Sequence, residues 1–190
     1  RVMTPHHRAV FAWLIVGATG LLLLPWYSLQ DTVLGVAWLR NWSHSDNAPA
    51  LLQALRHGRP WLLPLFVLLA AAAALLAPRL GRAARANGLI AIGAAGFGWV
   101  LVQGFAIGPG GWNFAVLADM FGPLSSRQYG MGLGAFLTAT AFAMILSLGL
   151  AERGLFKGDA FVAGTVVAIA ILIAVFTFFP VFKTLVQAIQ

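Results

Sequence analysis

The 190-residue chain contains no cysteine, and charged residues make up only 9% of it. The absence of cysteine excludes structural disulfides and thiolate metal sites, and it leaves the redox compartment open. The scarcity of charge excludes an ordinary water-soluble domain, because 61% of the residues are hydrophobic and the mean hydropathy is +0.88. We therefore predict an all-α integral membrane protein that is solvated by lipid.

Acidic residues are rarer than basic ones, with 5 Asp and Glu against 12 Lys and Arg. In a soluble protein the resulting pI of about 11.4 would suggest a nucleic-acid partner. Here the basic residues are scattered singly or in threes between apolar stretches, as topology determinants are. No nucleic-acid partner is expected.

Long uncharged stretches indicate the helices. The stretch Phe161–Phe182 has 22 residues without a charge, enough at about 1.5 Å per residue to cross roughly 30 Å of hydrocarbon. Pro180 is expected near the end of this span, before a polar-edged tail from Lys183 to Gln190. The whole chain, 1–190, is predicted to be one membrane domain of about five transmembrane helices, at residues 9–29, 60–78, 87–108, 130–150 and 161–182.

Small residues recur at helical spacing in two of these spans and predict close helix contacts and association with other chains. The first set is Gly88, Ala91, Ala95 and Gly98, and the second is Ala135, Ala139, Ala143 and Ser147. Between the spans, Val33–Leu39 is predicted to form a short helix along the membrane surface, and Trp112–Phe121 an amphipathic one.

The basic residues orient the spans. With the N-terminus inside, seven positive charges lie in inside segments and five in outside segments, and the dense cluster from Arg79 to Arg85 falls in a short inside loop. We therefore predict that the N-terminus is inside and the C-terminus outside. The inside residues are Arg1, Arg8, Arg79, Arg82, Arg85, Arg153 and Lys157, and the outside ones Arg40, Arg56, Arg59, Arg127 and Lys183.

No catalytic, cofactor-binding or metal-binding residue is predicted. All four histidines, His6, His7, His44 and His57, fall in expected loops, which disfavours a haem held between helices. No span carries an Asp, Glu, Lys or Arg well inside its apolar run, so no proton relay is expected. The adjacent pair His6 and His7 lacks a third metal ligand.

The remaining polar residues are expected to play structural parts. Hydrogen bonds to backbone or to another helix are predicted for Gln103, Thr138, Thr140, Thr165 and Thr177. Asp119 and Arg127 are interpreted as a surface ion pair or as solvated charges, and Gly108, Gly110 and Gly111 as a turn around Pro109. Glu152 and Asp159, which flank Arg153 and Lys157, are interpreted as a solvated charge cluster rather than an acid–base pair.

The last span and its exit, FPVFKTLVQA at 179–188, resemble the first core helix and periplasmic exit of binding-protein-dependent ABC importer permeases, with closest likeness to the ferric-iron type. Residues Leu14–Tyr27 and Gly130–Gly154, the latter ending in LAERG, are similar to the N-terminal extension of some of these permeases. The resemblance implies a bacterial inner-membrane location, an ATPase subunit that hydrolyses ATP inside, and a periplasmic binding protein that delivers substrate outside. It implies no enzymatic activity in this chain.

The family's cytoplasmic coupling element, a Glu-Ala-Ala stretch followed by glycine, has no counterpart here and is expected beyond Gln190, which makes the chain an expected part of a longer protein. Two other classes stay open. One is a non-catalytic accessory or assembly subunit of a larger membrane complex. The other is a membrane enzyme acting on lipids or isoprenoids, for which Asp119, Glu152 and Asp159 are the acidic residues close to span ends.

Overall fold

A computed structural model describes residues 5–29, 37–77, 80–108, 111–124 and 130–189. The fold is mostly α-helical, as the composition predicts. Its elements, in order, are α1 (Pro5–Leu22), α2 (Ala37–Arg40), α3 (Ala50–Arg56), η1 (Pro60–Leu62), α4 (Leu63–Ala74), α5 (Arg82–Ala106), β1 (Ile107–Gly108), β2 (Gly111–Trp112), α6 (Ala115–Phe121), α7 (Leu133–Glu152), η2 (Leu155–Gly158) and α8 (Ala160–Ile189).

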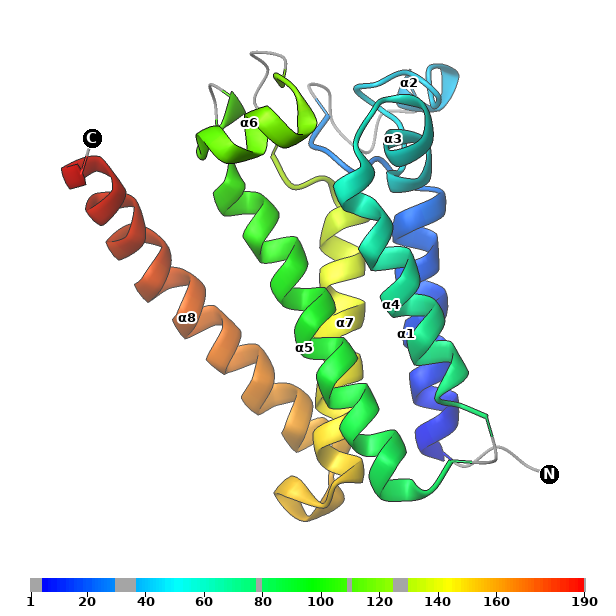
Figure 1. The fold of residues 1–190 in the computed structure, drawn as a ribbon. Coiled ribbons are helices and arrows are strands. Elements are labelled where there is room, and N and C mark those ends of the chain that lie inside the picture. Colours follow the sequence, from blue (N-terminus) through cyan, green and yellow to red (C-terminus); the bar gives the residue numbers. More distant parts are fainter. Residues whose placement is uncertain (1–4, 30–36, 78–79, 109–110, 125–129, 190) are drawn as a thin grey trace.

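Helices α1, α4, α5 and α7 lie side by side, and α8 diverges from them (Figure 1). The centre of the bundle is α7, which packs most extensively against α5 and α1 and buries residues along its whole length. The short helices α2, α3 and α6 gather at one end of the bundle, and the α4–α5 and α7–α8 connections lie at the other (Figure 1).

Small residues bring the central helices into close contact. A Cβ added to Gly20 of α1 would lie 2.6 Å from the carbonyl oxygen of Gly134 in α7, and one added to Gly93 of α5 would lie 2.5 Å from the backbone nitrogen of Leu146. Only glycine permits these approaches, because any side chain would occupy the space of the neighbouring backbone. The α7 stripe predicted to make helix contacts is confirmed at three of its four positions, since Ala135, Ala139 and Ser147 are buried and Ala143 is half-buried.

The prediction for α5 is wrong at three of its four positions. Gly88 does make a close helix contact, since a Cβ there would lie 2.6 Å from Leu75 Cδ1 at the end of α4. Ala91 and Ala95 are exposed, and a Cβ on Gly98 would meet nothing within 4 Å. Gly93 and Gly96 make the contact with α7 instead. Because α5 is rich in small and apolar residues around much of its circumference, spacing alone does not indicate which face turns inward.

Among the described residues, two helices, α5 and α7, are long and apolar enough to cross a bilayer by length and composition. Shorter apolar helices cover Pro60–Ala74 and Ala160–Ala174. The most apolar window of α7 is 61% buried, whereas that of α5 is only 28% buried. Much of the apolar surface of α5 therefore faces outward.

The helix ends differ from the predicted spans in two instructive places. The span predicted to end at residue 29 ends as a helix at Leu22, because the residue before Pro25 is disfavoured in helical conformation. The chain then pairs with the segment before α7, where Ser28 N donates to Gly130 O at 2.9 Å and Gly132 N donates to Trp26 O at 2.9 Å.

Helix α8 runs through Pro180 to Ile189 instead of ending in a tail. Proline removes one backbone donor, which a long helix tolerates when the residues on both sides remain helical. Beyond Gly164 most of the described side chains of α8 are exposed, including Ile169, Ile173 and Phe176. The only fully buried side chain described in α8 is Ala163, near its start.

Candidate functional site

An apolar pocket of about 290 Å³ lies at the end of the bundle where α4 begins and α5 ends. The β1–β2 hairpin turns the chain back after α5, so that Trp112 and Phe121 meet Trp61 of η1 edge to face, with ring centroids 4.9 and 5.4 Å from that of Trp61. We call this the aromatic pocket. Its lining residues are Pro60, Trp61, Pro64, Trp99, Val102, Gln103, Ala106, Trp112, Leu117 and Phe121.

The three tryptophans of the aromatic pocket differ in what their indole N–H groups do. Trp99 Nε1 donates to the carbonyl oxygen of Trp61 at 2.8 Å, and Trp112 Nε1 donates to that of Gly122 at 2.9 Å. Trp61 Nε1 is buried and has no hydrogen-bond partner among the described residues, and the same holds for Gln103 Nε2. A buried donor without a partner costs about 1–3 kcal/mol, so both groups require explanation.

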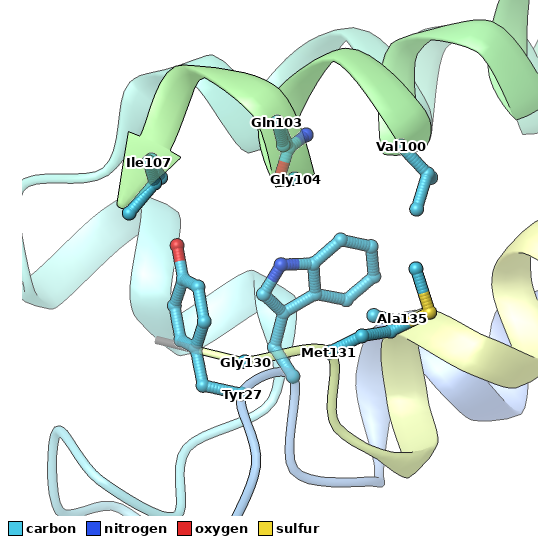
Figure 2. Close-up of a pocket in the computed structure, with 9 residues that line it drawn as sticks. Tyr27, Val100, Gln103, Gly104, Ile107, Gly130, Met131 and Ala135 are labelled. Atoms are coloured by element: carbon cyan, nitrogen blue, oxygen red, sulfur yellow. The ribbon is translucent and has the colours of Figure 1, made fainter. Parts of the chain in front are cut away.

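A second, smaller cavity of about 40 Å³ is also lined by Gln103, together with residues such as Tyr27 and Ile107 (Figure 2). Gln103 comes from α5, and the Tyr27 ring rises from the opposite side with its hydroxyl toward the end of α5 (Figure 2). This volume is enough for a water molecule, which needs about 10–15 Å³ measured this way. Gln103 lines both spaces, so water in the small cavity could serve its amide.

A polar cluster lies next to Tyr27. Arg59, which is 5% exposed, donates from Nη1 to Gln53 Oε1 at 2.5 Å, and its guanidinium lies 4.6 Å from the centre of the Tyr27 ring. Gln53 Nε2 in turn donates to the carbonyl oxygens of Ser45 and Ala48. Arg59 lies in a connection between predicted spans, yet its side chain is buried and links the α3–η1 turn to the segment after α1.

The opposite end of the bundle holds a buried ion pair. Glu152 at the end of α7 is 6% exposed and accepts hydrogen bonds from Arg85 of α5, one of them from Nε at 2.9 Å. Arg82 Nε donates to the Glu152 carbonyl oxygen at 3.2 Å. The interpretation of Glu152 as part of a solvated cluster is therefore wrong. Its local sequence contains Arg153 and Lys157, but both are exposed, and the partner comes from the α5 helix.

Asp119 and Asp159 are exposed. Asp159 Oδ1 accepts hydrogen bonds from the backbone N–H groups of Phe161 and Val162, at 2.8 and 3.2 Å, and so caps α8. Asp119 lies on α6, and Arg127, its predicted partner, lies outside the described residues. Asp119, Glu152 and Asp159 are not brought together. Asp119 belongs to α6, which lies at the opposite end of the bundle from the α7–α8 connection that holds Glu152 and Asp159 (Figure 1).

The structural role predicted for the threonines is confirmed at three positions. Thr138, Thr140 and Thr165 each donate to the carbonyl oxygen four residues earlier, at 2.8 to 3.0 Å. Thr138 also lies 3.5 Å from Gly17 O of α1, which links two helices. Thr177 is exposed on α8. Gln103 departs from the prediction, because its amide nitrogen has no such partner in the described part of the chain.

The histidines lie at both ends of the molecule. His6 and His7 are in the first turn of α1 rather than in a loop, whereas His44 and His57 lie beside α3, with His57 Nε2 3.1 Å from Ser43 O. Within the described ranges, no three His, Asp or Glu side chains lie close enough together to hold a metal ion. Gly108 and Gly111 pair across the β1–β2 turn, and Gly110 falls outside these ranges.

Comparisons with protein-family models, with curated proteins and with solved structures found no match to this chain. Its chemistry must therefore be argued from its own residues. The described side chains offer aromatic faces and hydrogen-bond donors in apolar surroundings at one end, and a buried ion pair at the other. The signal in the sequence for the aromatic pocket was the position of Trp61 and Trp112 near the ends of predicted spans.

Proposed function

We propose that this chain is a multi-pass membrane permease portion of a binding-protein-dependent ABC importer in a bacterial inner membrane. In this proposal α1, η1 with α4, α5, α7 and α8 are the five spans, with the N-terminus inside and the C-terminus outside. Ferric iron is the substrate that the sequence resemblance implies. ATP hydrolysis belongs to a partner subunit, and a periplasmic binding protein delivers the substrate.

The location in lipid is supported by the apolar side chains that the fold leaves on its outside. Helix α5 has a mean window hydropathy of 1.8 with only 28% of that window buried, so in water it would expose a large apolar face. The exposed apolar surface continues on α1, α4 and α7 with the side chains of Phe11, Ile15, Val67 and Phe136. Lipid removes the cost of these exposures.

The exposed apolar surface of α8 is the observation that supports the permease proposal. This 30-residue helix has the sequence that resembles a permease core helix, and beyond Gly164 it exposes apolar side chains on successive turns, such as Val166, Ile169, Leu172 and Phe176. A helix that leaves its own bundle in this way is suited to pack among helices of a larger translocation unit. In this proposal the four preceding helices, α1, α4, α5 and α7, correspond to the N-terminal extension found in some of these permeases.

An accessory or assembly subunit of a larger membrane complex is the second candidate. It is supported by the close glycine contacts of α1, α5 and α7, which build a rigid bundle. It shares with the first candidate the need for a partner at α8.

Co-purification of the full-length protein from its native membrane separates the two candidates. A permease brings down an ATPase subunit, and cross-linking in intact cells adds a periplasmic binding protein. An accessory subunit brings down another complex without an ATPase. Reading the gene beyond Gln190 gives an independent check: a Glu-Ala-Ala segment followed by glycine supports the permease, and a stop codon at that point argues against it.

A further inference from the structure

We propose that the guanidinium of Arg82 binds the phosphate of an anionic phospholipid at the end of the bundle where α5 begins and α7 ends. The inference goes beyond transport and assigns this end of the molecule a lipid-binding site. It rests on the bilayer location proposed above, but on neither the permease nor the accessory role.

The side chain of Arg82 is accessible from outside and is also held in place. Arg82 is exposed at the start of α5, and its Nε donates to the Glu152 carbonyl oxygen at 3.2 Å, which ties the guanidinium to the last turn of α7. Its two terminal amino groups have no hydrogen-bond partner among the described residues. A guanidinium presents its donors as a planar fork that matches the oxygens of a phosphate.

The carboxylate of Glu152 does not neutralise Arg82. Arg85, one turn along the same helix, donates to Glu152 Oε1 from both Nε and Nη2. The Glu152 side chain is only 5% exposed, and what it offers Arg82 is a backbone carbonyl, which has no formal charge. An anion from outside can therefore pair with Arg82 without displacing a carboxylate.

Positive charge exceeds negative charge at this end of the described chain. Besides Glu152, the carboxylate described here is that of Asp159, which is engaged by the backbone N–H groups of Phe161 and Val162. A surface with excess positive charge favours a lipid with a net negative charge over a zwitterionic lipid, whose own ammonium offsets its phosphate. The basic residues at this end are Arg8, Arg82, Arg85, Arg153 and Lys157 (Figure 1).

Exposed apolar side chains at the same end favour a lipid over a free phosphate ion. Leu155 in the α7–α8 connection and Phe161 in the first turn of α8 are 44% and 81% exposed. Ala83 and Ala84, which follow Arg82 on α5, are exposed as well. A free ion gains nothing from such side chains, whereas acyl chains cover them while the phosphate stays at the interface.

The rival explanation is that the basic residues only orient the chain in the membrane and bind no particular ligand. A diffuse field of this kind depends on the number of charges at the end of the bundle, not on the position of one guanidinium. Lys157 separates the two explanations. It lies in the α7–α8 connection, is exposed and has the same charge as Arg82, but it has no hydrogen bond to α5 or α7 within the described residues.

The test compares phosphatidylglycerol, which is anionic, with phosphatidylcholine, which is zwitterionic, the two having identical acyl chains. Binding to the purified full-length protein in detergent is measured by native mass spectrometry. We expect the wild type to bind phosphatidylglycerol about tenfold more tightly, as a charge-assisted hydrogen bond allows. Arg82→Gln keeps an amide donor for the Glu152 carbonyl and removes the charge, and it should bring the ratio of the two affinities close to one.

Lys157→Gln is the matched control, because it removes the same charge from the same end and should leave most of the preference in place. Circular dichroism of each variant checks the fold. Equal affinity of the wild type for the two lipids overturns the proposal without reference to any variant. An equal loss of preference in Arg82→Gln and Lys157→Gln also overturns it and assigns the preference to the summed charge of this end.

A further measurement separates the two sources of phosphate. Inorganic phosphate added to the wild type should leave phosphatidylglycerol bound, because the ion makes no contact with the apolar side chains. Displacement of the lipid by inorganic phosphate would assign the site to a free anion and overturn the lipid. Failure of the protein to float with membranes in a density gradient would instead overturn the bilayer location on which the proposal rests.

Discussion

Arg85 and Glu152 lie 67 positions apart in the sequence and form an ion pair in which 15% and 5% of the respective side chains are exposed. The pair joins the first turn of α5 to the last turn of α7. Both helices contribute to the most extensive contact of the bundle, so the pair fixes their register at one end. Removing Arg85 leaves Glu152 buried and unpaired, and removing Glu152 leaves Arg85 partly buried without its carboxylate.

We expect Glu152→Ala to lower the free energy of unfolding by about 1–3 kcal/mol, because the partly buried Arg85 guanidinium loses its carboxylate partner. Unfolding of the purified protein in mixed micelles with increasing denaturing detergent measures the change. Arg153→Ala is the control: Arg153 is adjacent but exposed, and its loss should change the stability little. The double variant Arg85→Met with Glu152→Leu should recover part of the loss. A single variant as stable as the wild type would contradict a structural role for the pair.

Gly93→Ala should destabilise the protein by about 1–3 kcal/mol, because the added methyl would lie 2.5 Å from the backbone of α7 and would force α5 and α7 apart. Gly98→Ala, on the same helix, has open space around the new methyl and should be neutral or slightly stabilising. The same unfolding assay compares the two variants. If Gly93→Ala proves as well tolerated as Gly98→Ala, the two helices do not approach each other as described.

The proposed orientation can be tested with introduced cysteines, since the chain has none of its own. Ser43→Cys and Arg153→Cys place a thiol at exposed positions at opposite ends of the bundle. A membrane-impermeant maleimide should label the first in intact spheroplasts and the second only after lysis. Ala91→Cys, exposed on α5 between the two ends, should resist labelling in both conditions because lipid covers it. The reverse pattern at the two ends would invert the topology, and ready labelling at position 91 would argue against a bilayer around α5.

Asp159→Ala should lower the free energy of unfolding by about 1 kcal/mol, because the carboxylate accepts from the first free N–H groups of α8. Asp159→Asn retains an acceptor and should lose less. Asp119→Ala removes a carboxylate that is exposed on α6 and provides the control. An effect of Asp119→Ala as large as that of Asp159→Ala would show that net charge, not capping, accounts for the change.

The helical class and the positions of the long helices follow from composition and apolar runs, and the backbone bonds of Thr138, Thr140 and Thr165 follow from their place inside helices. The inward face of α5 does not follow, because glycine and alanine occur on several of its faces and only the position of Leu146 and Phe142 decides between them. The prediction chose Ala91 and Ala95, which are exposed.

Polar pairs between residues far apart in the chain could not be predicted from the sequence either. Glu152 has Arg153 beside it and Lys157 one turn later, so a local interpretation favours a solvated cluster, whereas its partner Arg85 is brought to it by the packing of α5 on α7. Arg59 likewise stands in a polar connection and becomes buried only when Gln53 and Tyr27 fold around it. In the aromatic pocket Trp61 contacts Trp112, although α4 and α5 separate the two residues in the sequence. No local sequence pattern predicts this contact.

The divergence of α8 gives the molecule unequal cross-sections along its length (Figure 1). Near its start α8 is close to α7, where Gly164 lies against Met144, and toward its C-terminal end it diverges from α5 (Figure 1). In a lipid sheet a body of this outline displaces more area from one leaflet than from the other, which favours bending of the membrane. Further protein helices packed between α8 and α5 would make the area occupied in the two leaflets more equal and would remove that bending stress.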